Sequence, residues 1–455
     1  MARTEGFIMI NRRNFLTGMT AAGLAATVTP VNAAGITTSG GRLNPGSPDD
    51  QGPVLQALLD KAAKQNTILV LDPGRYRVSN ITLPKNTRIL GVSGSTVLEY
   101  AGGDHFIYGE NGSYTELSGI VFDGALQPVK EYADAAVRIN GTSHLKMSDC
   151  RITNAGQIGV QIDKSAGTFE RNRIDNAVGD AGFFGLENTG LMIFNNLVEQ
   201  CANNGILVYR WDRGEDNTIV SQNRVQYINA INGGTGPYGN GINTYQADGV
   251  VVTNNHVSDC AFSAVRSNSC SNIQITNNTC LRSGEAAVYS EFAFQGANIS
   301  GNIIDGGVRG ISIANLDKGG RLSVCANNLI RNIHDRVPYE EKHHFFGTGI
   351  SAEAECAITG NVIENSINFG IFLGWGNYLR NVAASNNVIR RTKTGFYVSV
   401  VEGTGKVNIT NNVMSQISRA GIVGYHWKDA VTGDLARDGG GKFGNLTIDG
   451  NRISS

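Results

Sequence analysis

The sequence predicts an all-β protein folded as a parallel β-helix, and three observations indicate it. An asparagine recurs through the chain at a nearly fixed interval, with branched apolar residues two places after it. Short apolar runs such as Ile371-Phe372-Leu373 are bounded by Gly and Asn and show no helical period. The composition of 58 Gly and 17% charged residues suits a turn-dense β protein. Such a repeat is typical of a solenoid whose units bury their apolar faces against one another.

The repeated asparagines define the coils. Successive ones are 23 to 27 residues apart, except at three enlarged coils with steps of 32, 33 and 39 residues. Coils stack at about 4.8 Å, so equivalent side-chain amides should lie above one another and hydrogen-bond along the stack. Asn also tolerates the left-handed conformation that a coil corner demands. The asparagines are Asn172, Asn196, Asn223, Asn255, Asn278, Asn302, Asn328, Asn361, Asn387, Asn412 and Asn451.

The region before the regular repeats is predicted to cap the stack. Residues 49–63 begin with two acidic residues and an early Pro and carry apolar residues at helical spacing. An amphipathic helix over the first coil would protect strand edges that otherwise invite aggregation. We assign residues 49–100 to this cap with the first coils, and residues 101–455 to the repeat domain, giving about 11 to 13 coils in all.

The N-terminus carries the features of an export signal. Paired arginines, Arg12 and Arg13, are followed by Phe15 and Leu16, a weakly apolar stretch and a small-residue cleavage site. This pattern resembles a twin-arginine signal peptide, which we place at residues 1–33, with a linker at 34–48. No later run is long enough to span a bilayer. We therefore expect the twin-arginine translocation machinery as a partner, and a periplasmic or secreted mature chain.

Beyond the signal, the chain resembles the right-handed parallel β-helix superfamily typified by pectate lyases. The likeness lies in the segment Asp72-Pro73-Gly74-Arg75-Tyr76 and in the Gly-Ile-x-Val coils. It is most similar to a family of twin-arginine-exported bacterial repeat proteins. The catalytic blocks of polygalacturonases, alginate epimerases and pectate lyases are absent from the sequence. The resemblance therefore implies a fold and transfers no catalytic residue.

The strand after each Gly provides candidate site residues. Side chains alternate along a strand, so the second and fourth positions should face outward and form two columns on one sheet. Three successive coils then bring together Asn243 with Tyr245, Arg266 with Asn268, and Tyr289 with Glu291. The enlarged coils should project loops beside this patch, at residues 227–238 and 334–346, and a third loop at 425–442 could form a C-terminal lid.

This patch suggests a groove for a chain of sugars. We assign substrate binding to Tyr209, Trp211, Asn243, Tyr245 and Asn268, because aromatic faces and amides suit sugar rings and hydroxyls. Arg266 could hold a uronate carboxylate through two parallel bonds, with Tyr289 transferring a proton in a β-elimination. Hydrolysis by an inverting mechanism is the alternative, with Glu291 and Glu353 as the carboxylate pair. The catalytic candidates are Arg266, Tyr289, Glu291 and Glu353.

The function predicted from these residues is polysaccharide binding, with lyase-like cleavage as the leading activity. A non-catalytic carbohydrate-binding or envelope-structural β-helix is the alternative from another class, because the known catalytic blocks are missing. The formal net charge of -1 gives no bulk attraction to nucleic acid. We expect a monomer and assign no metal ligand. The cofactor is left open, with calcium as one candidate.

Overall fold

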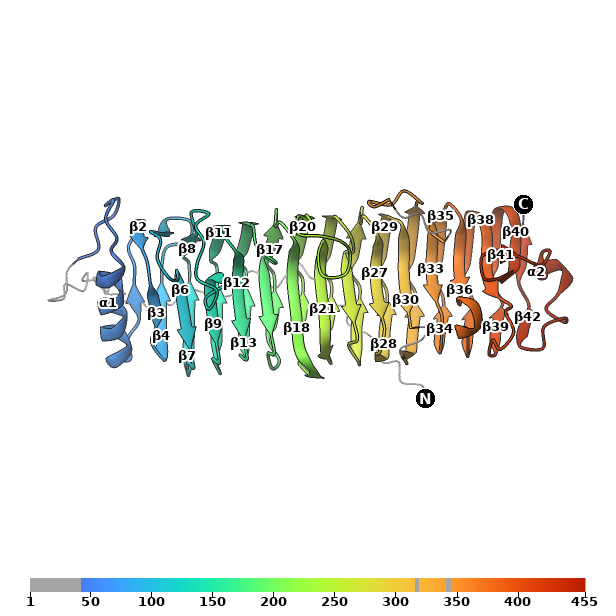
Figure 1. Cartoon of the computed structure of the whole chain (residues 1–455), viewed down its shortest axis with the longest axis horizontal. Coiled ribbons are helices and arrows are strands. Elements are labelled where there is room, and N and C mark those ends of the chain that lie inside the picture. The colour runs from blue at the N-terminus through green and yellow to red at the C-terminus, as the bar shows by residue number, and fades with distance from the viewer. Residues whose placement is uncertain (1–41, 316–318, 341–344, 455) are drawn as a thin grey trace, which may run out of the picture. The chain divides into compact units, whose positions relative to one another are not determined.

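The repeats form the coils of a right-handed parallel β-helix in the computed structural model, which describes residues 42–315, 319–340 and 345–454. Most coils contribute three strands, which pair in parallel with the equivalent strands of the next coil. A representative coil contains β13 (Gly167–Glu170), β14 (Arg173–Ala177) and β15 (Phe183–Leu186). The next contains β16 (Met192–Phe194), β17 (Leu197–Glu199) and β18 (Asn204–Glu215). Figure 1 shows these coils stacked along the unit Gly40–Ser455.

Stacking gives the solenoid three faces. The first strands form a 15-stranded sheet that runs from β1 (Leu69–Val70) to β42 (Leu446–Asp449). The second strands of the coils, such as β14 and β17, form the second face, and the third strands, such as β15 and β18, form the third face. These two faces merge near the C-terminus because β38 (Val388–Ser399) and β40 (Val413–His426) run through both. The described chain makes about 14 turns, more than the 11 to 13 predicted. The early coils, with β4 (Asn86–Leu90) and β7 (Tyr114–Ser118), lack the repeated Asn, so the count of asparagines misses them.

The predicted asparagine ladder is present at the corner between the first and second faces. It is unbroken from Asn172 to Asn451. At Asn278, Oδ1 accepts the backbone N–H of Asn255 at 3.0 Å, and Nδ2 donates to the Val252 carbonyl at 3.0 Å. The left-handed conformation belongs to the preceding residue instead, as at Asn277 with φ 55°. The ladder asparagines therefore satisfy buried backbone groups, and their neighbours make the turn.

The glycines that open the third-face strands permit close stacking. A Cβ on Gly205 would lie 2.4 Å from the carbonyl oxygen of Gly241 in the next coil. A Cβ on Gly241 would lie 2.8 Å from the Ala264 carbonyl oxygen. The residues that follow these glycines, Ile206 and Ile242, are fully buried in the solenoid core. A glycine is thus required where two coils approach at this corner.

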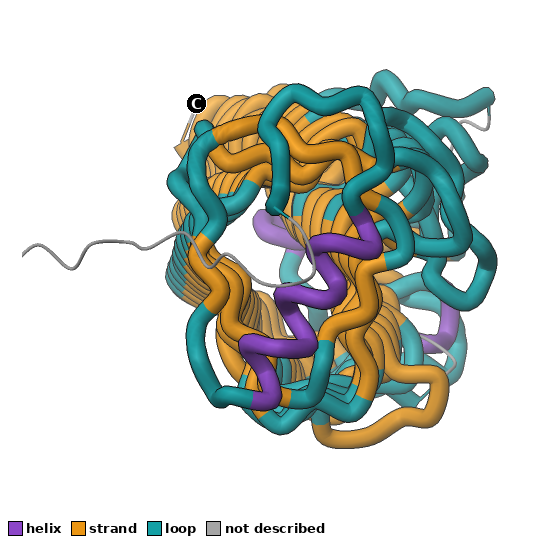
Figure 2. Tube along the Cα trace, turned by 90° about the vertical axis from the view of Figure 1, so that its left-hand side faces the viewer, coloured by secondary structure: helices purple, strands orange, loops and turns teal. Residues whose placement is uncertain are grey.

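Both ends of the stack are covered. Helix α1 (Gly52–Lys64) lies across the first coil and buries Leu55, Leu58 and Leu59, as predicted for the cap (Figure 2). At the C-terminal end, the short helix α2 (Leu435–Asp438) packs against β40. The Asp434 carboxylate accepts the backbone N–H groups of Gly421 and Ile422, both at 3.0 Å. These contacts satisfy strand edges that would otherwise be open.

The three enlarged coils project their loops as expected. The first loop joins β20 (Arg224–Ile228) to β21 (Asn240–Asp248). The second joins β32 (Leu329–Ile333) to β33 (Thr348–Ala352), and the third follows β40. Figure 2 shows the loops gathered mainly along one side of the stack. The first two leave the solenoid at the same corner, so both can cover the third face.

The predicted signal peptide at residues 1–33, with Arg12, Arg13, Phe15 and Leu16, lies outside the described residues, as does most of the linker at 34–48. Export by the twin-arginine route therefore stays a prediction. Within the described part of the chain, no helix is long and apolar enough to cross a membrane.

Candidate functional site

The register of the third face brings the predicted columns together. Asn243 pairs with Arg266, and Tyr245 with Asn268, between β21 and β24 (Val265–Asn268). Arg266 in turn pairs with Tyr289, and Asn268 with Glu291, on β27 (Ala286–Glu291). None of these side chains points into the hydrophobic core, so they share one wall, as the alternation predicts. The wall is not freely open to solvent, however, because the loops cover it: Asn243 is 2% exposed and Arg266 8%.

The first loop divides this wall into two cavities. The first, which we call the aromatic cavity, has a volume of about 450 Å³ and contains all five predicted substrate-binding residues. The second, the arginine cavity, has a volume of about 810 Å³. Gly236, Pro237 and Tyr238 face the aromatic cavity, whereas Gly234 and Thr235 face the arginine cavity. Both volumes are in the range of small-molecule sites.

Six of the fourteen residues that line the aromatic cavity are aromatic. Tyr209 lies against Tyr245 at a ring-centroid distance of 5.4 Å and against Trp211 at 6.3 Å. Trp211 is 59% exposed and Phe292 is 40% exposed, although both are large apolar side chains. The remaining walls come from Asp180, Phe184, Asn204, Leu207, Asn243, Arg266 and Asn268. The cavity therefore offers flat apolar surfaces beside amide and charged groups.

Asn243 lines this cavity, and its side-chain oxygen has no hydrogen-bond partner among the described residues. Its Nδ2 donates to the Tyr209 hydroxyl at 2.8 Å and to the Gly236 carbonyl at 3.3 Å. Its Oδ1 is buried and has no hydrogen-bond partner among the described residues. A buried polar atom without a partner costs about 1–3 kcal/mol, which a bound hydroxyl donor would recover. Asn243 thus has one unpaired acceptor beside the cavity.

Arg266 is held in a buried ion pair. Its Nε donates to Glu291 Oε1 at 2.8 Å and its Nη2 to Glu291 Oε2 at 2.9 Å. Its third nitrogen, Nη1, donates to the Thr235 hydroxyl at 2.9 Å. Burial raises the pKa of Glu291, and the Arg266 charge opposes that rise. We therefore assign this ion pair a structural role. The Glu291 carboxylate already accepts the two Arg266 hydrogen bonds that a uronate would need.

The other two catalytic candidates lie apart from the aromatic cavity. Tyr289 faces the arginine cavity, with the Arg266 guanidinium 4.7 Å from its ring centroid, and burial raises the pKa of its hydroxyl. Glu353 is 7% exposed and lines neither cavity. Its Oε2 accepts the Asn315 backbone N–H at 3.1 Å, and burial raises its pKa to about 7. The register does not bring Glu291 and Glu353 together across one open cleft.

Glu285 connects the two loops that cover the third face. It was not among the site residues predicted from the sequence. Its carboxylate accepts hydrogen bonds from the Thr235 hydroxyl of the first loop and from the Tyr339 hydroxyl of the second, the latter at 3.0 Å. Its Oε2 also lies 3.9 Å from Arg266 Nη1. One buried carboxylate thus fixes both loops over the third face. Its place just before the Ala286-Ala287-Val288 strand was the only sequence signal for it.

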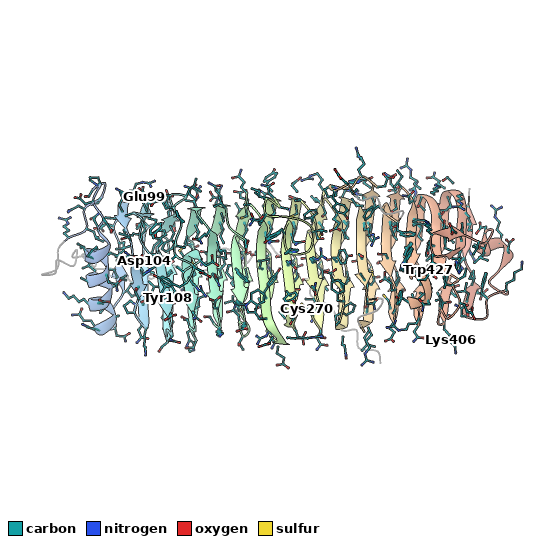
Figure 3. All side chains as sticks on the ribbon, viewed as in Figure 1. Glu99, Asp104, Tyr108, Cys270, Lys406 and Trp427 are labelled. Atoms are coloured by element: carbon teal, nitrogen blue, oxygen red, sulfur yellow. The ribbon has the colours of Figure 1, made fainter. Side chains whose placement is uncertain are left out.

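Toward the C-terminus, the same face is filled by stacked rings. Phe372 and Tyr397 stack at 3.8 Å between centroids, and Tyr397 and Tyr425 at 4.2 Å. Trp375 lies over this stack and contacts Trp427, labelled in Figure 3, at 5.2 Å. Within residues 42–315, 319–340 and 345–454, no three His, Cys, Asp or Glu side chains gather as a metal site. The calcium suggestion is therefore left without a candidate ligand set in that region.

The fold defines the chain as a right-handed parallel β-helix protein. Residues 85–225 match a family model described as a right handed beta helix region. The N-terminal fragment of bacteriophage phi29 gene product 12 is 15% identical, with a TM-score of 0.52 over 83% of this chain and 66% of that one. The pre-mature phi29 gene product 12 is 14% identical, with a TM-score of 0.53 over 90% of this chain and 56% of that one.

The chain thus spans between about half and two thirds of the length of these phage proteins. The A-module of mannuronan C-5 epimerase AlgE4 from Azotobacter vinelandii is 16% identical, with a TM-score of 0.42 over 79% of this chain and 96% of that one. No curated protein sequence matches the chain significantly. At these identities the phage structures support the fold alone.

Proposed function

We propose that this protein binds a carbohydrate chain through the aromatic cavity. The observation that carries the proposal is the convergence of Tyr209, Trp211 and Tyr245 on a cavity of about 450 Å³ beside the unpaired Oδ1 of Asn243. The C–H faces of a sugar ring pack on aromatic rings, and its hydroxyls satisfy amide groups at the ring edge. A purely apolar ligand would leave the Asn243 oxygen buried and unpaired.

The length of the third face supports a polymer as the ligand. The aromatic cavity involves β18, β21 and β24. The arginine cavity continues over β27 and β30 (Arg309–Ala314) to Trp375, which follows β36 (Phe369–Leu373). Each strand step along the stack adds about 4.8 Å. A single sugar ring would fill only part of this length, whereas a polysaccharide could follow the face from one cavity to the other.

Binding without cleavage is the form of this proposal that the geometry supports best. Elimination by the predicted pair needs Arg266 free to contact the uronate and Tyr289 able to lose its proton near neutral pH. Glu291 occupies the Arg266 fork, and burial makes Tyr289 harder to deprotonate. The hydrolytic alternative needs two carboxylates facing one bond, but Glu353 lines neither cavity. Lyase-like and hydrolytic cleavage therefore rank below non-catalytic binding.

Calorimetric titration of the Trp211→Ala variant tests the proposed site. The ligands are neutral and acidic oligosaccharides of equal length. Removal of an aromatic anchor from the centre of a site costs about 2 kcal/mol, so we expect the Kd to rise by at least tenfold. Tyr227→Ala is the matched control, because Tyr227 is 52% exposed and lines neither cavity. No binding across a broad panel would overturn the proposal, and an unchanged Kd in Trp211→Ala would exclude this cavity.

Cleavage is tested with the wild-type protein and the same polymers. Elimination would produce unsaturated sugars that absorb in the ultraviolet, whereas hydrolysis would release reducing ends without that absorbance. We expect neither product, even where calorimetry shows binding. Unsaturated product that disappears in Arg266→Ala and Tyr289→Phe would instead restore the lyase assignment. New reducing ends that depend on Glu291 and Glu353 would restore the hydrolase assignment.

A further inference from the structure

We propose that the arginine cavity is an anion subsite in which Arg309 binds the acidic group of a sugar residue, so that the ligand is an acidic polysaccharide. This inference rests on the proposed carbohydrate binding and adds the chemical class of the ligand. It also moves the acid-binding role from Arg266, where the sequence placed it, to a residue that the strand columns did not include.

The guanidinium of Arg309 is largely unused. Its single hydrogen bond to a described residue is a long one, from Nη1 to the Ser312 hydroxyl at 3.4 Å. Its Nε is buried without a partner among the described residues. No carboxylate in that part of the chain lies within ion-pair distance of it, although burial raises the pKa of the Glu353 carboxyl and the Arg309 charge opposes that rise. Arg309 lines the cavity, and a guanidinium carries five donors and a permanent charge, so it has binding capacity left for a ligand there.

The surroundings of Arg309 hold it in place without neutralising it. The guanidinium carbon lies 5.3 Å from the ring centroid of Phe346, a contact that orients the planar group. Phe262, Tyr339 and Trp375 supply further aromatic wall in the same cavity. Apolar walls lower the local dielectric and strengthen an ion pair formed there. A carboxylate would fit this fork through two parallel bonds.

Two carboxylates also line the arginine cavity, and neither takes the place of a ligand. Glu285 accepts hydroxyl hydrogen bonds from Thr235 and Tyr339 and lies near the Arg266 charge. Glu340 is exposed, so water and salt screen it. The contrast with Arg266 is direct, because all three nitrogens of Arg266 have partners. Arg309 is therefore the guanidinium of the two that is prepared for an anion.

Positive charge continues along the same face beyond the arginine cavity. A further cavity of about 410 Å³ shares Phe345 with it and is lined by Lys393, Arg419 and Lys428, together with the acidic Asp429. None of these three cations is ion-paired with a described residue, whereas most arginines on the solenoid surface have carboxylate partners. A track with several available cations suits a polymer with repeated acidic groups better than a single small acid.

The test compares ligands that differ only in charge. Calorimetric titrations use a uronate oligosaccharide, a neutral oligosaccharide and a sulfated oligosaccharide of the same length, each at low and at high salt. We expect the wild-type protein to bind the uronate at least tenfold more tightly than the neutral sugar at low salt, with the difference shrinking at high salt. Tighter binding of the sulfated ligand would identify sulfate as the acidic group.

Variants then assign the preference to Arg309. Arg309→Gln should lose at least tenfold in uronate affinity and leave neutral-sugar affinity within twofold, and Arg309→Lys should retain part of the preference. Arg331→Gln is the matched control, because Arg331 is exposed, pairs with Asp305 and lines none of these three cavities. Its uronate affinity should not change.

Equal affinity of the wild-type protein for uronate and neutral sugar would overturn the anion subsite, as would an acid preference that survives in Arg309→Gln. In either case, a loss of neutral-sugar binding in Trp211→Ala would leave the proposed function standing. If no sugar binds at all, both proposals fail together. Circular dichroism spectra matching the wild type show that each variant is folded, and Arg309→Lys serves as the conservative test if Arg309→Gln does not fold.

Discussion

Two corners of the same solenoid differ in how regularly their residues repeat. The corner between the first and second faces repeats one residue, Asn, in coil after coil, and every ladder amide has the same partners in its neighbours. The corner that leads to the third face carries the first two enlarged loops beside connections of ordinary length. Repetition at the first corner builds the scaffold, and variation at the second builds the cavities. The residues that hold the molecule together are thus separated in space from those proposed to bind ligand.

The ladder corner should be the most sensitive to substitution. Asn278→Ala would leave the Asn255 N–H buried without a partner, remove the amide bond to the Val252 carbonyl and interrupt the amide chain. Each unsatisfied group costs about 1–3 kcal/mol, so we expect unfolding to become easier by about 3–5 kcal/mol. Urea denaturation measures the change. Asn298→Ala, on a first-face strand with a partly exposed side chain, is the control, and an equal loss there would contradict the ladder's structural role.

A buried carboxylate next to this framework should give a smaller effect that depends on pH. Asp216 is fully buried, and its Oδ2 has no hydrogen-bond partner among the described residues, although Arg210 Nη1 lies 3.9 Å away. Burial raises its pKa from 3.8 to about 6. The folded state therefore favours the protonated form, and stability falls as pH rises from about 4 through 6. Asp216→Asn should raise the free energy of unfolding by about 1–3 kcal/mol at pH 7 and hardly change it at pH 3.5.

Thermal melts of Asp216→Asn at both pH values measure this difference. Asp212→Asn is the control, because Asp212 is an exposed residue of β18, the strand that ends just before Asp216. A stabilisation of equal size at the two pH values would show that ionisation of Asp216 is not the cause.

The loop-bearing corner should respond locally. Glu285→Ala removes the acceptor shared by the Thr235 and Tyr339 hydroxyls, which frees both loops while the coils beneath keep their backbone pairing. We expect global stability to fall by only about 1–2 kcal/mol, with hydrogen exchange of residues 233–238 faster by at least tenfold. Glu364→Ala, at a more exposed carboxylate on another face, should leave that exchange unchanged. Unchanged exchange in Glu285→Ala would show that Glu285 does not hold the loops.

These two corners also explain what could be predicted from the sequence. The period of the asparagines predicts the stack, and strand alternation predicts that Asn243, Arg266 and Tyr289 share a wall, which the register confirms. The pairing of Arg266 with Glu291 was not predicted, although adjacent coils place them one step apart. The strand register predicts which residues are neighbours on adjacent coils. It does not predict which charged neighbours will form an ion pair once the loops exclude water.

Arg309 and Thr235 were missed for a different reason. Arg309 precedes the Gly of its strand, so it lies at a corner where inward and outward positions no longer alternate. Thr235 belongs to a loop with no counterpart in other coils, and its contact with Glu285 joins residues 50 positions apart. Periodicity carries no information about such contacts. The part of the site that the repeat encodes was therefore predicted, and the part that the insertions encode was not.

The ends of the stack do not set how many coils lie between them. Helix α1 packs on the first coil, and Asp434 accepts two backbone N–H groups of β40 near the last one. A longer or shorter rod would arise by gain or loss of whole internal repeats, each changing its length by about 4.8 Å. Insertion of one repeat between the two cavities would widen their spacing by that increment and leave both terminal closures intact.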